Sequence, residues 1–247
     1  MAEGIWQIHA EPAVPTVIGT AGSAFLYFQL KDFCSEYSGK RDNQFYMSIG
    51  RQIGCKSRFL LETDNWYAIP TMGSLTVGYI LLVTKQHYLS LANLDSNLFF
   101  EMLNLKKSVE DFLFKKLGMH CIAFEHGTTN SYSTGANSVD HVHLHILPFS
   151  RPVWNEIITN IPATTVNTVE SYNDLFEVWK KNIPDTYLLF QDLDQKLYYI
   201  SDSSYMPSQL FRKCLAPYLG ANYWDWRSES YSNNILETIS LFKGIIE

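Results

Sequence analysis

Polar and apolar residues alternate along one short stretch of the chain, from His141 to Leu147. Three of the seven histidines alternate here with apolar residues: a valine and a leucine lie between them, and an isoleucine follows the third. A period of two residues is typical of a β-strand with one face in a core, and successive side chains of a strand point to opposite faces. The pattern predicts a strand that presents His141, His143 and His145 on one face and ends at Pro148, which has no N–H for a sheet ladder.

The pattern upstream of this strand predicts a hairpin, a second strand and a long helix. Residues 58–70 favour a hairpin, and residues 75–84 form an apolar run of strand length. Apolar residues at helical spacing over 94–117 predict a helix that packs on a core, with Asp95 or Ser96 as its N-cap and a glycine at its end. Four lysines of this helix are expected to face water: Lys106, Lys107, Lys115 and Lys116.

Between the helix and the histidine strand, residues 121–127 predict another strand, and beyond residue 150 the pattern changes. Residues 168–181 predict a helix capped by Thr168, and residues 186–201 predict a hairpin. Two more helices are expected at 208–219 and 233–246. The fold class is therefore α+β, an antiparallel sheet with a long packing helix, plus a small α/β C-terminal extension. The expected parts are an N-terminal arm, a sheet domain and a C-terminal extension, at residues 1–24, 25–150 and 151–247.

Composition narrows the class of protein. The 247 residues are 46% hydrophobic, enough to bury a core, and the net charge of −6 disfavours a nonspecific nucleic-acid binder. The four cysteines are scattered and form no CxxC pair, which favours reduced intracellular thiols. The N-terminus lacks a basic start followed by an apolar run, and no stretch approaches 18 apolar residues. We therefore expect a cytoplasmic protein without a membrane partner.

The histidine row points to chemistry run by imidazole. With an unperturbed pKa of ~6.5, imidazole is a neutral nucleophile and a protonated donor near neutral pH. Neighbours on one face lie roughly 6.5–7 Å apart, which suits a row of rings along a polyphosphate. Three other interpretations stay open from the residues alone: a buried structural row, a metal site and a solvated strand face.

The stretch from His141 to Leu147 resembles the signature of the histidine triad (HIT) superfamily, in which three histidines alternate with apolar residues. The resemblance implies a HIT-like catalytic domain over 25–150 and a reaction at the α-phosphate of a nucleotide. It implies that His143 attacks phosphorus and carries the nucleotidyl group as a phosphoramidate. His141 would orient His143 and bind phosphate, and His145 would donate a hydrogen bond to the phosphate or the bridging oxygen.

The resemblance also covers the segments before the triad. The run Phe124 to Gly127 and the lead-in at 135–140 look like the superfamily's approach to the motif, and Glu125 with His126 could form a supporting pair. Asn137 stands where the superfamily usually has Gln, and Ser138 is kept. The other candidates for nucleotide or phosphate binding in this half of the chain are Asn130, in the loop, and His87, after the strand at 75–84. In that strand Tyr79 follows Gly78 where the superfamily has His.

Two C-terminal segments, 208–216 and 224–227, look like the extension of a HIT branch that includes RNA-splicing and lariat-processing proteins. In this interpretation Arg212 and Arg227 could reach a distal phosphate, because Arg forms bidentate phosphate contacts. The alternative is an arginine that is paired with Asp225 or solvated.

The leading hypothesis is a nucleotide hydrolase or nucleotidyltransferase that forms a nucleotidyl-histidine, with a dinucleoside polyphosphate or nucleotide phosphoramidate as substrate. The alternatives are a nucleotide- or RNA-binding module without turnover and a metal-dependent hydrolase. No cofactor and no resident metal are required, although Mg²⁺ could accompany the nucleotide, and a nucleic-acid partner would be a short RNA or a cap. The resemblance implies a homodimer, but the C-terminal extension could occupy that surface or act as a pseudo-symmetric partner.

Overall fold

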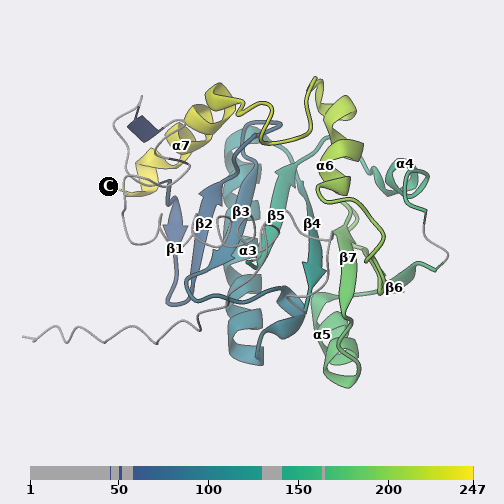
Figure 1. The fold of residues 1–247 in the computed structure, drawn as a ribbon. Coiled ribbons are helices and arrows are strands. Elements are labelled where there is room, and N and C mark those ends of the chain that lie inside the picture. The colour runs from purple at the N-terminus through teal and green to yellow at the C-terminus, as the bar shows by residue number, and fades with distance from the viewer. Residues whose placement is uncertain (1–44, 46–49, 52–57, 130–140, 163–164, 247) are drawn as a thin grey trace, which may run out of the picture.

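An antiparallel sheet forms the centre of the computed structural model, which describes residues 45, 50–51, 58–129, 141–162 and 165–246 (Figure 1). Its eight strands follow the order β1-β2-β3-β5-β4-β7-β8-β6, and every pair of neighbours is antiparallel. The strands are β1 Leu61–Glu62, β2 Trp66–Pro70, β3 Ile80–Thr84, β4 Cys121–Thr128, β5 His143–Pro148, β6 Asn167–Val169, β7 Thr186–Gln191 and β8 Leu197–Ile200. The expected antiparallel sheet is confirmed, whereas the expected N-terminal arm lies outside the described residues.

Helices cover both faces of the sheet. They are α3 Ser96–Leu117, α4 Trp154–Ile158, α5 Tyr172–Lys181, α6 Leu210–Leu215 and α7 Ser232–Ile246, with the short 3-10 helices η2 Leu91–Asn93 and η3 Ala216–Leu219. Helices α3, α5 and α7 supply buried side chains to one face, and α4 and α6 supply them to the other. In Figure 1, α3 runs behind the strands. Among the helices of the described residues, we find none with the length and apolar character to cross a bilayer.

Helix α3 is the long packing helix that the periodicity predicted. The side chain of Asp95 accepts a hydrogen bond from the N–H of Leu98 at 2.9 Å, which satisfies one of the free donors of the first turn. Gly118 ends the helix with a φ of +69°, a conformation that glycine adopts without strain. The apolar stripe from Leu98 to Leu113 is buried against the sheet.

The sheet continues from strands β1–β5 into the C-terminal part of the chain. Strand β7 pairs with β4 along six residue pairs, from Ala123 opposite Gln191 to Thr128 opposite Thr186. A Cβ at Gly127 would lie 2.2 Å from the ring of Tyr187, so this position must be glycine for the two strands to pack in this way. The C-terminal part therefore covers the edge that β4 would otherwise expose with a strand of its own.

Three expected elements have different bounds in the structure. Strand β3 begins at Ile80 instead of residue 75, because the residues before it form turns. The Thr71 N–H donates a hydrogen bond of 3.1 Å to the Tyr79 carbonyl across these turns. Thr168 does not cap a helix; it pairs with Tyr198 in the sheet, and Ser171 caps α5. The helix expected at 208–219 divides into α6 and η3, where Pro217 removes a helical N–H.

Glu125 is a buried carboxyl group on the α3 face of β4. Its side chain is 1% exposed and accepts hydrogen bonds from the N–H of Leu91, at 3.1 Å, and from the hydroxyl of Tyr187. Burial raises its pKa to about 8, although both hydrogen bonds oppose the shift. The folded protein therefore holds a proton that the unfolded chain, with a value near 4.5, releases at neutral pH.

This difference predicts a pH dependence of stability. The stabilisation is complete below about pH 4.5 and is lost as the pH rises through 8, by up to about 1.4 kcal/mol per pH unit for one proton. Glu125→Gln cannot ionise, so we expect its free energy of unfolding to change less than that of the wild type between pH 5 and pH 8. Urea unfolding at several pH values measures the difference. If the free energy of unfolding of the variant falls with pH as steeply as that of the wild type, Glu125 is ionised in the folded protein.

Candidate active site

His143 opens strand β5, which lies between β3 and β4 near the middle of the sheet. Its Nδ1 lies 2.6 Å from the backbone carbonyl oxygen of His141. A carbonyl can only accept, so Nδ1 carries the proton and Nε2 of the neutral ring holds the lone pair. Burial lowers the pKa of His143, although the ring keeps some exposure to solvent. The result is a neutral imidazole with its nucleophilic nitrogen assigned.

His141 lies just before β5 and is 2% exposed. Its Nε2 lies 2.9 Å from the carbonyl oxygen of Thr84 and 3.0 Å from the hydroxyl oxygen of the same residue. Burial and then the nearby His87 lower its pKa to about 3, so the ring is neutral and donates from Nε2 to the Thr84 carbonyl. This anchor fixes the backbone carbonyl that orients His143. The structure thus gives His141 a route to orient His143 through its backbone.

His145 shares the face of His143, as the alternation predicted, and the two ring centroids lie 5.0 Å apart. Its ring stacks on Phe124 of β4 with 4.5 Å between centroids and 13° between planes. The hydroxyl of Tyr79 lies 2.8 Å from its Nδ1. Burial, followed by the charges of His143 and Arg212, holds its pKa well below the usual range. The sequence showed Tyr79 only as a departure from the superfamily pattern and gave no signal of this contact.

The other predicted binding residues fall into two groups. Asn130, Asn137 and Ser138 lie outside the described residues. His87 is exposed, and its ring meets the ring of His141 edge to face with 5.3 Å between centroids. His87 therefore lies at the triad, and a contact with phosphate stays a prediction.

The two C-terminal arginines have different surroundings. Arg212, on α6, is 3% exposed; it donates from Nε to the Trp224 carbonyl at 2.9 Å and from Nη2 to the Gly73 carbonyl at 2.6 Å. Arg227 lies 3.5 Å from a carboxylate oxygen of Asp225, which is the ion pair that the sequence left open as the alternative. Arg212 therefore belongs to the surroundings of His145, and phosphate binding by either arginine stays a prediction.

Glu125 and His126 do not form the expected pair, because neighbours on a strand point to opposite faces. Glu125 lies on the α3 face, whereas His126 faces the same side as Phe124 and is close enough to His143 for the charge of one ring to lower the pKa of the other. Both ring nitrogens of His126 are buried, and neither makes a hydrogen bond of normal geometry among the described residues, although the backbone of Ser203 is close enough to oppose the lowering of its pKa. The structure thus places His126, in addition to His87, beside the triad.

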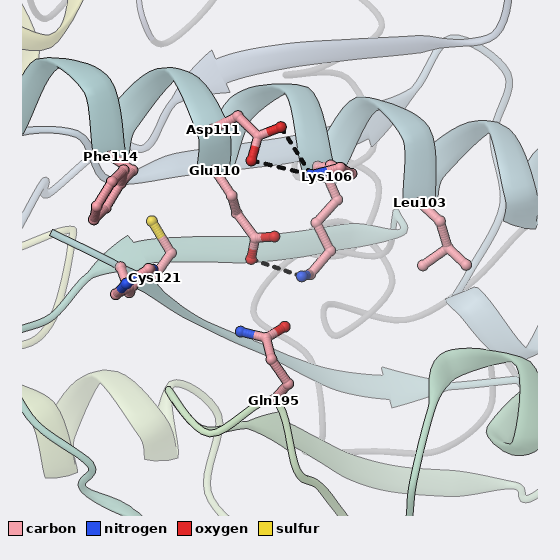
Figure 2. A pocket seen from close by; sticks show the side chains of 9 residues that line it. Leu103, Lys106, Glu110, Asp111, Phe114, Cys121 and Gln195 are labelled. Carbon is pink, nitrogen blue, oxygen red and sulfur yellow. Dashed lines mark hydrogen bonds and ion pairs between the residues drawn. The ribbon is translucent and has the colours of Figure 1, made fainter.

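A separate pocket of about 380 Å³ lies on the opposite face of the sheet, between α3, the start of β4 and the turn after β7 (Figure 2). Lys106 lines it and is 4% exposed, so the prediction that this lysine faces water is wrong. Its Nζ lies 2.6 Å from a carboxylate oxygen of Glu110, which compensates the buried charge. None of the triad histidines lines this pocket.

The triad side chains do not form a metal site with other ligand residues of the described ranges. Within the described ranges, no three side chains of the types His, Cys, Asp and Glu lie close enough together to hold a metal ion. One nitrogen of each triad ring is already hydrogen-bonded within the protein. The partners are the Thr84 carbonyl for His141, the His141 carbonyl for His143 and the Tyr79 hydroxyl for His145. The arrangement is that of three oriented imidazoles, each with one nitrogen bound to the protein.

The buried His126 yields a prediction about stability. Burial of a polar ring costs free energy that weak hydrogen bonding does not fully compensate, so His126→Leu should raise the free energy of unfolding or leave it unchanged at pH 7. Burial and the charge of His143 lower the pKa of His126 to about 4, so the wild type loses stability as the pH falls from 6.5 towards 4. The variant should lose less over this range. Thermal unfolding at pH 7 and pH 5 tests both statements, and a lower melting temperature of the variant at pH 7 would contradict them.

Comparison with known proteins agrees with this geometry in the central part of the chain. Residues 54–151 match the family model described as the HIT domain. No curated protein matches the chain.

Three solved structures illustrate the similarity of this chain to known folds. A hypothetical histidine triad nucleotide-binding protein from Sulfolobus tokodaii is 19% identical, with 40% of this chain and 64% of that chain covered and a TM-score of 0.33. A HIT family hydrolase from Clostridium thermocellum is 16% identical, with 41% and 86% covered and a TM-score of 0.30. Yeast Ap4A phosphorylase in complex with AMP is 11% identical, with 59% of each chain covered and a TM-score of 0.36.

The chain thus spans less than two thirds of the archaeal protein and of the yeast enzyme. These likenesses are too low to transfer an activity. The resemblance of the C-terminal segments to the splicing branch stays a prediction. Residues 54–151, less than half of the chain, are thus similar to the HIT domain, and this part contains the three histidines of and just before β5.

Proposed function

We propose that this protein is a nucleotide hydrolase or nucleotidyltransferase that acts at an α-phosphate through a covalent nucleotidyl-His143. The observation that carries the proposal is the 2.6 Å hydrogen bond from Nδ1 of His143 to the carbonyl of His141. This bond leaves Nε2 unprotonated and stabilises the positive charge that the ring acquires when Nε2 forms a bond to phosphorus. The HIT domain match over residues 54–151 supports the same class of reaction.

In the first step Nε2 of His143 attacks the α-phosphorus, and the bond from phosphorus to the leaving group breaks. His145, whose Nδ1 is hydrogen-bonded to Tyr79, donates its Nε2 proton to the departing atom and so leaves Nε2 free to accept a proton in the second step. A positioned donor of this kind contributes roughly 10²–10⁴-fold to the rate. The nucleotidyl group is then held on His143 as a phosphoramidate.

In the second step water or another acceptor attacks the same phosphorus, and the bond from phosphorus to Nε2 breaks. The proton of the acceptor passes to His145, and His143 returns to its neutral form. Because burial lowers the pKa of His143, this ring stays neutral at pH values where a free histidine is protonated. We therefore expect kcat/KM to stay high below pH 6.5.

The phosphate oxygens and the nucleoside need further partners. We propose Asn137, Ser138 and Asn130 as donors from the loop before β5. His87 and the two C-terminal arginines, Arg212 and Arg227, complete the set of proposed phosphate contacts. The hydroxyl of Ser138 and the amides of the asparagines can donate to phosphate oxygens.

The proposed reaction uses no cofactor, and Mg²⁺ would enter only as a counterion of a polyphosphate substrate. The proposed partner is the nucleotide itself, with a short RNA or a cap as the form of nucleic acid that such a site could accept. A homodimer remains part of the proposal, although strand β7 already covers the β4 edge of the HIT-matched part.

The decisive variant is His143→Ala. Loss of the nucleophile should lower kcat/KM at least ~10³-fold for every nucleotide substrate. The assay compares dinucleoside polyphosphates, nucleotide phosphoramidates and capped nucleotides, with products identified by mass. Quenching the wild type in alkali and digesting it should yield a His143 peptide with the mass of one nucleotidyl group, since phosphoramidate bonds are labile in acid.

The matched control is His120→Ala, because His120 is exposed and stacks on Phe114 away from the triad. It should keep the wild-type rate and the adduct. If the wild type binds nucleotides but neither forms an adduct nor turns them over, the protein is a nucleotide- or RNA-binding module instead. A His143→Ala variant with a near-normal rate would exclude the proposed mechanism.

A metal-dependent hydrolase makes a different prediction about chelation. With a nucleotide phosphoramidate, which carries less charge than a polyphosphate, the rate should persist after dialysis against EDTA. Metal content and rate are measured on the same sample. Loss of activity that Zn²⁺ or Mn²⁺ restores would favour the metal mechanism over the imidazole mechanism.

A further inference from the structure

The third triad histidine is held by a residue type that the superfamily pattern does not supply. Tyr79 is fully buried at the entrance to β3, and its hydroxyl oxygen lies 2.8 Å from Nδ1 of His145. A phenol can donate or accept, and so can the Nδ1 position of a neutral imidazole. The bond alone therefore leaves two tautomers of His145, of which only one has an N–H at Nε2.

Arg212 favours one of these two arrangements. The carbonyls of Trp224 and Gly73 accept hydrogen bonds from its Nε and Nη2, and the guanidinium is close enough to the Tyr79 hydroxyl to lower the pKa of that phenol both by its charge and as a hydrogen-bond donor. The guanidinium carbon lies 5.5 Å from the centre of the Tyr79 ring. Guanidinium has donors and no acceptor, so a phenol beside it is stabilised when its oxygen lone pairs face the cation. The phenol proton then points to Nδ1 of His145.

The charge of Arg212 acts on both partners in the same sense. It opposes the effect of burial on the pKa of Tyr79, which burial raises to about 12, because a cation stabilises the phenolate. It also contributes to the lowered pKa of His145, because a cation disfavours imidazolium. The first effect favours Tyr79 as the donor to Nδ1, and the second keeps the His145 ring neutral. A neutral ring that accepts at Nδ1 carries its proton at Nε2.

We propose that Tyr79 and Arg212 are positioning residues that hold His145 as the Nε2–H tautomer and resupply its proton when the leaving group needs one. The inference rests on the proposed function and extends it to leaving groups such as amines and alkoxides. It also assigns to the C-terminal part, through α6, a contribution to the chemistry of the HIT-matched part.

The proton movements balance. As the bond from phosphorus to the leaving atom breaks, that atom takes the proton from Nε2 of His145. Nδ1 takes the proton from the Tyr79 hydroxyl, and the resulting phenolate lies beside the Arg212 cation. When water attacks the nucleotidyl-His143, its proton enters at Nε2, the Nδ1 proton returns to Tyr79, and the site regains its starting state.

The first experiment measures the tautomer directly and needs no turnover. Histidine labelled with ¹⁵N gives distinct long-range ¹H–¹⁵N correlations for the two tautomers, and loss of signals in His145→Gln assigns the ring. The wild type should show Nε2–H and an unprotonated Nδ1 at pH 7. Tyr79→Phe, which removes one oxygen atom, should populate both tautomers. A wild-type His145 protonated at Nδ1 would overturn the proposal even if the protein proves to be a nucleotide hydrolase.

The second experiment compares two leaving groups on one nucleotide. Adenosine 5′-p-nitrophenyl phosphate releases an acidic phenol that needs no proton, whereas an adenosine 5′-N-alkylphosphoramidate releases a basic amine. Tyr79→Phe should lower kcat for the amine by about 10–100-fold, within the range for general acid catalysis, and kcat for nitrophenol by less than about threefold. A purely structural role would lower both rates alike, and that result, or no change in either rate, would overturn the relay.

Two further variants complete the set. Tyr218→Phe removes a hydroxyl from an exposed tyrosine on η3 and should change neither rate nor tautomer. Arg212→Lys keeps the cation and should retain more of the amine rate than Arg212→Met, provided that thermal unfolding shows both to be folded. Absence of turnover in the wild type together with the Nε2–H tautomer would refute the proposed function while leaving the role of Tyr79 supported.

Discussion

The proposed chemistry depends on the hydrogen bond from His143 to the backbone carbonyl of its neighbour two residues earlier. A backbone acceptor cannot rotate away or change its protonation state, so the tautomer of His143 is as fixed as the chain itself. The carbonyl is in turn held because the ring of His141 is anchored to Thr84 on the adjacent strand. The contact between Thr84 of β3 and the chain just before β5 thereby determines that Nε2 of His143 is the nitrogen able to attack phosphorus.

Burial is the second part of this arrangement. Each triad ring has a lowered pKa because the site removes water from the charged form. Neutral rings keep defined donors and acceptors, whereas protonated rings would repel one another. His126, whose ring nitrogens are buried, adds another neutral imidazole to this face of the sheet, because burial lowers its pKa to about 4.

The sequence predicted the sheet, α3 and the shared face of His143 and His145, because these follow from local periodicity and capping. It failed where long-range contacts decide the outcome. The local pattern predicts Thr168 as a helix cap, but in the structure Thr168 pairs with Tyr198, 30 residues later, in the sheet. The pattern predicts Lys106 on the surface, but the side chain is buried in a pocket, where the carboxylate of Glu110 compensates its charge. The bond between Tyr79 and His145 joins residues 66 positions apart, and no local pattern encodes it.

The pairing of β4 with β7 has a consequence for synthesis on the ribosome. Strand β4 ends at Thr128 and its partner begins at Thr186, 58 residues later, so at ~5–20 residues per second the edge stays uncovered for roughly 3–12 s. During that interval its backbone N–H and C=O groups form an open template for any other extended chain. The nascent protein therefore passes through a state in which the uncovered β4 edge can pair with other chains and aggregate. Chaperones, or a low rate of expression that keeps nascent chains apart, would reduce this aggregation.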